Sequence, residues 1–180
     1  MSRSRWMAVA AVILAAALAR LLPHPPNVTP IAAMALFGGA FGAGLLPALL
    51  LPLAAMAVSD VLMALIGHVD GGWHPTLPFV YASILATVII GRLVARRLTA
   101  LSVAGGAVAA SLLFFVVTNL GTWLAGGIYP LTAEGLSACF VAALPFLRLT
   151  LLGDLFYSGL LFGGFAVAER WLAGRVIFRA

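Results

Sequence analysis

Four polar residues stand where the sequence is otherwise apolar, and they are the first candidates for chemistry. Asp60, Asn119, Arg148 and Asp154 lie within or at the edge of long apolar runs. A charged group in hydrocarbon is costly unless it is paired or hydrated, so such residues mark functional sites by default. We expect these four side chains to set the polarity of a pocket for a small solute.

A second group of polar residues interrupts the apolar runs. Its members are His24, Asn27, His68, Asp70, Trp73 and His74. Imidazole and carboxylate are suitable ligands for zinc, nickel or cobalt. The histidines lack the i, i+4 spacing of a helical metal site, and their segments contain Pro and Gly. A metal-ion carrier is therefore one alternative, and a stiff loop over 74–78 that leads into the next helix is the other.

Signatures of membrane enzymes and of disulfides are missing. The sequence has no Gly-x-Ser-x-Gly elbow, no His-Glu-x-x-His and no P-loop. The single cysteine, Cys139, excludes an intrachain disulfide. We therefore expect that the chain is not an enzyme and binds no cofactor.

The composition shows what must position these residues. The chain has 180 residues, of which 64% are hydrophobic and 8% charged. A soluble domain carries about 25% charged residues, so a water-soluble globule is excluded. All ten basic residues are arginines, and they form no stripe between polar segments, which excludes a nucleic-acid-binding protein.

Apolar runs predict an all-α, polytopic membrane protein of one domain, 1–180. A membrane-spanning helix needs about 20 apolar residues. The run from Ile31 to Gly67 is too long for one helix, and the glycines of 38–44 with Pro47 divide it. The six predicted spans are about 6–22, 31–43, 46–67, 79–94, 104–125 and 146–172. The connection 126–145 has room for a short helix.

The arginines predict the orientation of these spans. With a cytoplasmic N-terminus, only Arg20 and Arg148 fall toward the outside. The arginines at cytoplasmic ends are then Arg3, Arg5, Arg92, Arg96, Arg97, Arg170, Arg175 and Arg179. This distribution follows the positive-inside rule and predicts that both termini are cytoplasmic.

In this orientation the polar residues gather in the outer half of the membrane. The arrangement predicts an outward-facing pocket roofed by the loops 23–30, 68–78 and 126–145. The alternative is a structural or assembly protein in which Arg148 pairs with Asp154 or Asp60 to lock helices together. In that case Arg20 reaches the lipid headgroups.

The first predicted span carries a stripe of small residues, Ala11, Ala15 and Ala19. Such a stripe allows another helix to approach closely, either within the bundle or from a partner. The same segment, with Arg3 and Arg5 before it, also has the pattern of a cleavable signal peptide.

Three motifs resemble one bacterial family. The run from Leu21 to Gly39 (LLPHPPNVTPIAAMALFGG), the run from His74 to Tyr81 (HPTLPFVY) and Leu151-Leu152-Gly153-Asp154 resemble an uncharacterised family of small membrane proteins assigned to transport. In size and six-helix layout the chain is also similar to the substrate-binding S components of energy-coupling-factor vitamin transporters. That similarity implies a multi-pass protein of the bacterial inner membrane.

The S-component resemblance also implies roles for particular residues. The substrate site of that group is built from the loops after helices one, three and five, which correspond here to the three roof loops. An Ala-x-x-x-Ala face on helix one, matched by Ala11, Ala15 and Ala19, contacts a transmembrane coupling subunit that works with ATPases. The cobalamin-binding type includes members with a loop cysteine toward the cobalt, and this chain has His68 and His74 there instead.

The sequence thus predicts a membrane subunit that binds a small organic solute for uptake, and the expected solute is a vitamin, in particular a cobalamin-like molecule. The expected partners are this solute, the lipid bilayer and the coupling subunit. The predicted substrate-binding residues are Asn27, Asp60, His68, Trp73, His74, Asn119, Arg148 and Asp154.

Overall fold

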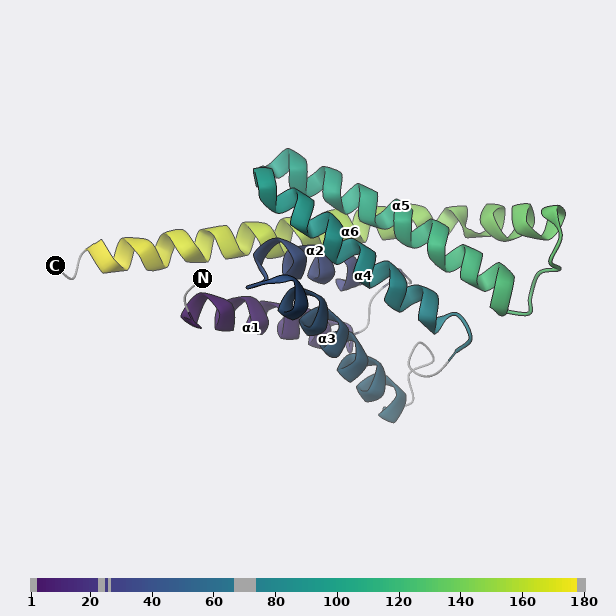
Figure 1. The fold of residues 1–180 in the computed structure, drawn as a ribbon, viewed down its shortest axis with the longest axis horizontal. Coiled ribbons are helices and arrows are strands. Elements are labelled where there is room, and N and C mark those ends of the chain that lie inside the picture. The colour runs from purple at the N-terminus through teal and green to yellow at the C-terminus, as the bar shows by residue number, and fades with distance from the viewer. Residues whose placement is uncertain (1–2, 23–24, 26, 67–73, 178–180) are drawn as a thin grey trace.

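The computed structural model describes residues 3–22, 25, 27–66 and 74–177; for 3–5 and 172–177 it describes the backbone but not the side chains. This part of the chain is helical and contains no strand. Its helices are α1 (Arg3–Ala19), α2 (Ile31–Phe41), α3 (Leu45–Leu65), α4 (Leu77–Val94), the short 3-10 helix η1 (Ala95–Arg97), α5 (Ala100–Ala125) and α6 (Ala133–Ile177) (Figure 1).

Four of these helices are long and apolar enough to cross a membrane. They are α3, α4 together with η1, α5, and the part of α6 from Ala133 to Trp171. The apolar parts of α1 and α2, Trp6–Ala19 and Ile31–Phe41, are shorter than a full span. The all-helical, apolar architecture is thus confirmed, while the count of six spans stays a prediction.

Successive helices run in opposite directions, so the connections gather at two ends of the bundle (Figure 1). α1 begins and α6 ends at the left of the view, where η1 and the connection 42–44 also lie. α3 and α5 end, and α4 and α6 begin, toward the other end. The arginines of η1 therefore lie at the same end as the start of α1 and the end of α6, as the sorting by charge predicts.

The short helix α2 forms the centre of the bundle. Its residues Ala32–Gly39 are all buried, and it contacts all five of the other α-helices. An apolar helix with no polar face belongs in a protein core or across a membrane, and α2, with 11 residues, is shorter than a full span. Gly39 and Gly91 make this burial possible on the α4 side, because a β-carbon at either would collide with the backbone of the other helix.

The division of the long apolar run is confirmed. α2 ends at Phe41 and α3 begins at Leu45, close to the predicted 31–43 and 46–67. Gly42 is extended and Gly44 has a φ of 148°, a conformation that L side chains rarely adopt. Gly38 and Gly39, however, belong to α2 rather than to the break, since they serve its close packing.

The prediction for residues 126–145 was wrong in its extent. Only 126–132 form a connection, because α6 begins at Ala133 and continues through Pro145 without a break. A helix of 45 residues is about 68 Å long, more than twice the roughly 30 Å of the hydrocarbon core. Proline is tolerated within membrane helices when neighbouring groups satisfy the freed backbone. Figure 1 shows α6 passing beyond the bundle.

Candidate binding site

A group of polar side chains joins three helices near one end of the bundle. Arg20, directly after α1, forms an ion pair with Asp60 of α3, with 3.0 Å between Nη2 and Oδ1. Tyr81 of α4 donates its hydroxyl hydrogen to Oδ2 of the same carboxylate, at 3.0 Å. Arg20 also donates to the Ser59 hydroxyl through Nη1. These four residues, Arg20, Ser59, Asp60 and Tyr81, are called the Arg20 cluster below.

The Arg20 cluster is shielded from solvent. The side chains of Arg20 and Asp60 are only 6% and 14% exposed, and Ser59 is buried. Further hydrogen bonds to the remaining donors and acceptors stabilise a buried ion pair. Ser59, Tyr81 and the sulfur of Met56, 2.8 Å from Arg20 Nη1, supply such bonds, whereas the buried Arg20 Nε has no partner among the described residues. The cluster therefore fixes the relative positions of α1, α3 and α4.

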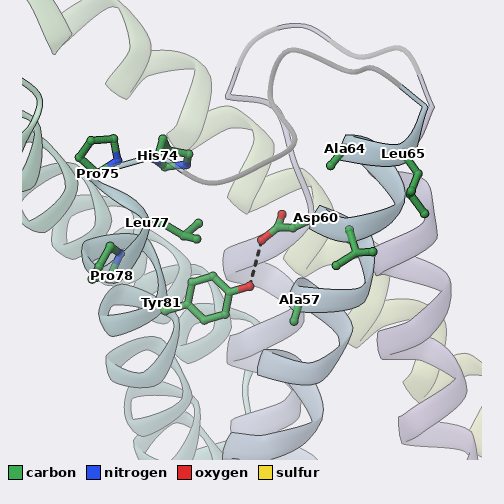
Figure 2. Close-up of a pocket in the computed structure, with 10 residues that line it drawn as sticks. Ala57, Asp60, Ala64, Leu65, His74, Pro75, Leu77, Pro78 and Tyr81 are labelled. Atoms are coloured by element: carbon green, nitrogen blue, oxygen red, sulfur yellow. Dashed lines mark hydrogen bonds between the residues drawn. The ribbon is translucent and has the colours of Figure 1, made fainter.

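A pocket of about 770 Å³ opens beside the cluster, between the last turns of α3 and the start of α4. Its lining residues are Ala57, Asp60, Val61, Ala64, Leu65, His74, Pro75, Leu77, Pro78 and Tyr81. Figure 2 shows the Asp60 carboxylate and the Tyr81 hydroxyl meeting across the space between the two helices, with His74 and Pro75 near the loop.

The pocket has the chemistry of a site for a small, largely apolar molecule. Sites of this kind have volumes of about 300–1,000 Å³ and apolar walls with a few placed polar groups. An ionised carboxylate has about four lone-pair positions, of which Arg20 and Tyr81 occupy two. Asp60 can therefore still accept a hydrogen bond from a ligand. His74, whose Nδ1 lies 2.7 Å from Thr76 Oγ1, offers a second polar group.

Two of the eight predicted substrate-binding residues, Asp60 and His74, line this pocket. His68 and Trp73 lie outside the described residues, as do His24 and Asp70 of the loop group.

The other four predicted residues lie elsewhere. Asn119 donates to Phe115 O within its own helix, at 2.7 Å. Arg148 and Asn27 are exposed, and Asp154 is buried between α5 and α6 against Ser111. None of them lines the α3–α4 pocket, so the described residues of the predicted site are not all gathered there.

The predicted pairing of Arg148 was also wrong. Of the ion pairs among described residues, none joins Arg148 to Asp60 or Asp154, whereas Arg20 pairs with Asp60 instead of reaching the headgroups. Sequence reasoning missed Tyr81 and Ser111 as partners of the two aspartates. Both lie inside apolar helices, and their polarity was a signal, but spacing alone does not show which helices are neighbours.

The alanine stripe faces outward. Ala11 and Ala15 are exposed and Ala19 is half-buried, so packing within the bundle does not account for the stripe. Ala15 and Ala19 also line a smaller pocket, of about 290 Å³, between α1 and α6.

A metal site finds no support among the described residues, where no three of the His, Cys, Asp and Glu side chains lie close enough together to hold a metal ion. The loop histidines His24 and His68, on which a metal carrier would depend, lie outside them.

Comparison with known proteins gave one result. A model described as "Family of unknown function (DUF6580)" matches residues 1–175. Neither a curated protein nor a solved structure matches the chain.

Proposed function

Because the chain belongs to DUF6580, a family of unknown function, its role has to be inferred from the site, and we propose that it is a membrane subunit that binds a small organic solute for uptake. The observation that carries this proposal is the pocket of about 770 Å³ with the Asp60 carboxylate at its wall. The apolar surface would take up most of the solute, and the carboxylate would orient it.

The charge of the cluster narrows the class of solute. Arg20 already balances the charge of Asp60, so the site does not require a cationic ligand. A molecule with an apolar body and N–H or O–H donors fits best, because its donors can use the free lone pairs of Asp60. A vitamin is the class that we propose, and a cobalamin-like molecule is the form that the S-component resemblance suggests. The pocket would enclose a smaller vitamin or contact one part of a cobalamin.

The proposed setting is the bacterial inner membrane, crossed six times with the pocket on the outer side. The alternating directions of the helices and the shared end of the termini support an even number of crossings (Figure 1). The exposed Ala11 and Ala15 support a role of the stripe in contacting a coupling subunit that works with ATPases.

The test is to measure binding to the purified protein by mass spectrometry of co-purifying molecules and by thermal shift with a vitamin panel that includes cobalamin. Ala57→Phe and Ala54→Phe form a matched pair, since both alanines are exposed on α3 and only Ala57 lines the pocket. Ala57→Phe should weaken binding about tenfold or more, equivalent to about 1.4 kcal/mol, whereas Ala54→Phe should not. A protein that binds no panel member and carries no solute would contradict the proposal.

One observation favours a second function, that of a structural or assembly protein. The members of the Arg20 cluster bind one another and hold three helices together. Asp60→Asn separates the two functions. Loss of uptake in a protein that still folds and inserts supports the binding site, whereas loss of the protein itself supports packing.

A further inference from the structure

A second aspartate lies in the interior of the bundle, away from the pocket. Asp154 of α6 is 4% exposed and Ser111 of α5 is fully buried. Both are near the middle of their apolar helices, so in a membrane they would lie close to its central plane. Asp154 Oδ2 and Ser111 Oγ are 2.6 Å apart.

The elements packed against α6 bring no charge to Asp154. α2 and α5, which both contact α6, carry no acidic, basic or histidine residue and no tyrosine or cysteine. Val28, in the connection before α2, approaches Gly153. The described residues around Val28 in that connection are also neither charged nor titratable. Directly after α1, Arg20 is engaged by Asp60. On α6, Arg148 is exposed and Tyr157 lines the smaller pocket.

A count of hydrogens indicates the state of the carboxyl group. A serine hydroxyl has one hydrogen to donate, and Ser111 Oγ lies 3.0 Å from its acceptor Ala107 O as well as 2.6 Å from Asp154. If Ser111 donates to Ala107, the hydrogen between Ser111 and Asp154 must come from Asp154. If Ser111 instead donates to an ionised Asp154, that carboxylate is buried with one neutral donor, which is costly, so the neutral acid is favoured in this arrangement too.

A second hydroxyl lies one turn further along α6. Ser158 is 1% exposed, and its Oγ has no hydrogen-bond partner. Residues four apart share a face of a helix, so Ser158 lies on the side of α6 that carries Asp154. An unsatisfied hydroxyl in this position can donate to the carboxylate when its proton leaves.

We propose that Asp154 is a proton-binding site of the bundle. The carboxyl group holds H⁺ as the neutral acid and donates a hydrogen bond to Ser111. After the proton leaves, Ser111 and Ser158 both donate hydrogen bonds to the carboxylate. A buried acid of this kind is the element that proton-coupled movement through a membrane requires. The assignment is independent of the solute and of the α3–α4 pocket.

Infrared spectroscopy of the reconstituted protein tests this assignment, with ¹³C-labelled aspartate to identify the bands. At neutral pH the wild type should show the C=O stretch of a protonated aspartic acid, and high pH should remove it. Asp154→Asn should abolish the band, since the amide keeps the shape but carries no acid proton. Ser111→Ala should move the band to higher frequency, because it removes a hydrogen bond.

Asp60→Asn is the control, since Asp60 is ion-paired and its replacement should leave the band in place. A wild type without an acid band at neutral pH, or a band that survives Asp154→Asn, would overturn the proposal. Loss of the band on adding Na⁺ but not K⁺ at constant pH would also overturn it and assign the site to sodium.

Discussion

The two aspartates inside the apolar helices, Asp60 and Asp154, are buried in different ways. Asp60 faces a guanidinium and a phenol and lies beside a pocket. Asp154 has the Ser111 hydroxyl as its one hydrogen-bond partner among the described residues and lies between packed helices. An ion pair can stay charged in the interior when its hydrogen bonds are complete, whereas a lone carboxyl group is accommodated at least cost as the neutral acid. The first therefore suits ligand orientation, and the second suits the binding of a proton.

The largest effect should come from breaking the ion pair. Arg20→Met leaves the Asp60 carboxylate buried without its cation, which should cost about 3–5 kcal/mol of unfolding free energy. Denaturation of the detergent-solubilised variant measures this. The double variant Arg20→Met, Asp60→Leu should recover most of the loss, and a double variant as unstable as Arg20→Met would contradict the comparison.

A smaller effect is expected at Tyr81. Tyr81→Phe removes one hydrogen bond to a charged acceptor and keeps the ring, so it should cost about 1.5 kcal/mol, the lower end of the range for such bonds, because Tyr81 is only part-buried. The same denaturation experiment applies. Tyr157→Phe is the matched control, since Tyr157 is also half-buried and lies on α6, away from Asp60. Equal losses of unfolding free energy in Tyr81→Phe and Tyr157→Phe would show that the Tyr81 hydroxyl has no special role at Asp60.

Ser111→Ala should have a still smaller effect. It removes a hydrogen bond between two membrane helices, a class worth about 0.6 kcal/mol on average. Ser158→Ala is its control and should cost nothing measurable, because the Ser158 hydroxyl has no partner to lose. A loss of several kcal/mol in Ser111→Ala would mean that Asp154 is charged and depends on this donor.

The smallest effect on stability should come from Asp154→Asn. If the carboxyl group is neutral, an amide of the same shape can donate to Ser111 in its place, so the midpoint of thermal unfolding should not change measurably. Asp60→Asn, by contrast, should lower the midpoint clearly, since it leaves Arg20 without its counter-charge. A similar drop of the unfolding midpoint in Asp154→Asn and Asp60→Asn would contradict the assignment of a neutral Asp154 and a charged Asp60.

Much of the fold could be predicted from the sequence because it depends on local composition. The break between α2 and α3 follows from glycine at 42 and 44, and the apolar runs predict helices at the observed places. The start of α6 was missed, since Pro145 was interpreted as the end of a loop although membrane helices tolerate proline. Because α6 begins at Ala133, Asp154 lies near the middle of this helix and not near its start, as the predicted span 146–172 implied.

The site was predicted only in part. Asp60 and His74 were identified, because an acid in an apolar run and a histidine at a helix entrance are visible in the sequence. Arg20 as the partner of Asp60, and Tyr81 and Ser111 as hydrogen-bond donors, were not.

By itself the sequence determined that this chain is helical and apolar, and it indicated which arginines share one end of the bundle. Those properties depend on composition and on position along each helix, which a linear pattern records. Only the tertiary structure decided which residues meet: Arg20 with Asp60, Ser111 with Asp154, and the walls of the pocket. The physical reason is that lateral neighbours depend on the packing and rotation of helices around the central α2, and position along a helix carries no information about either.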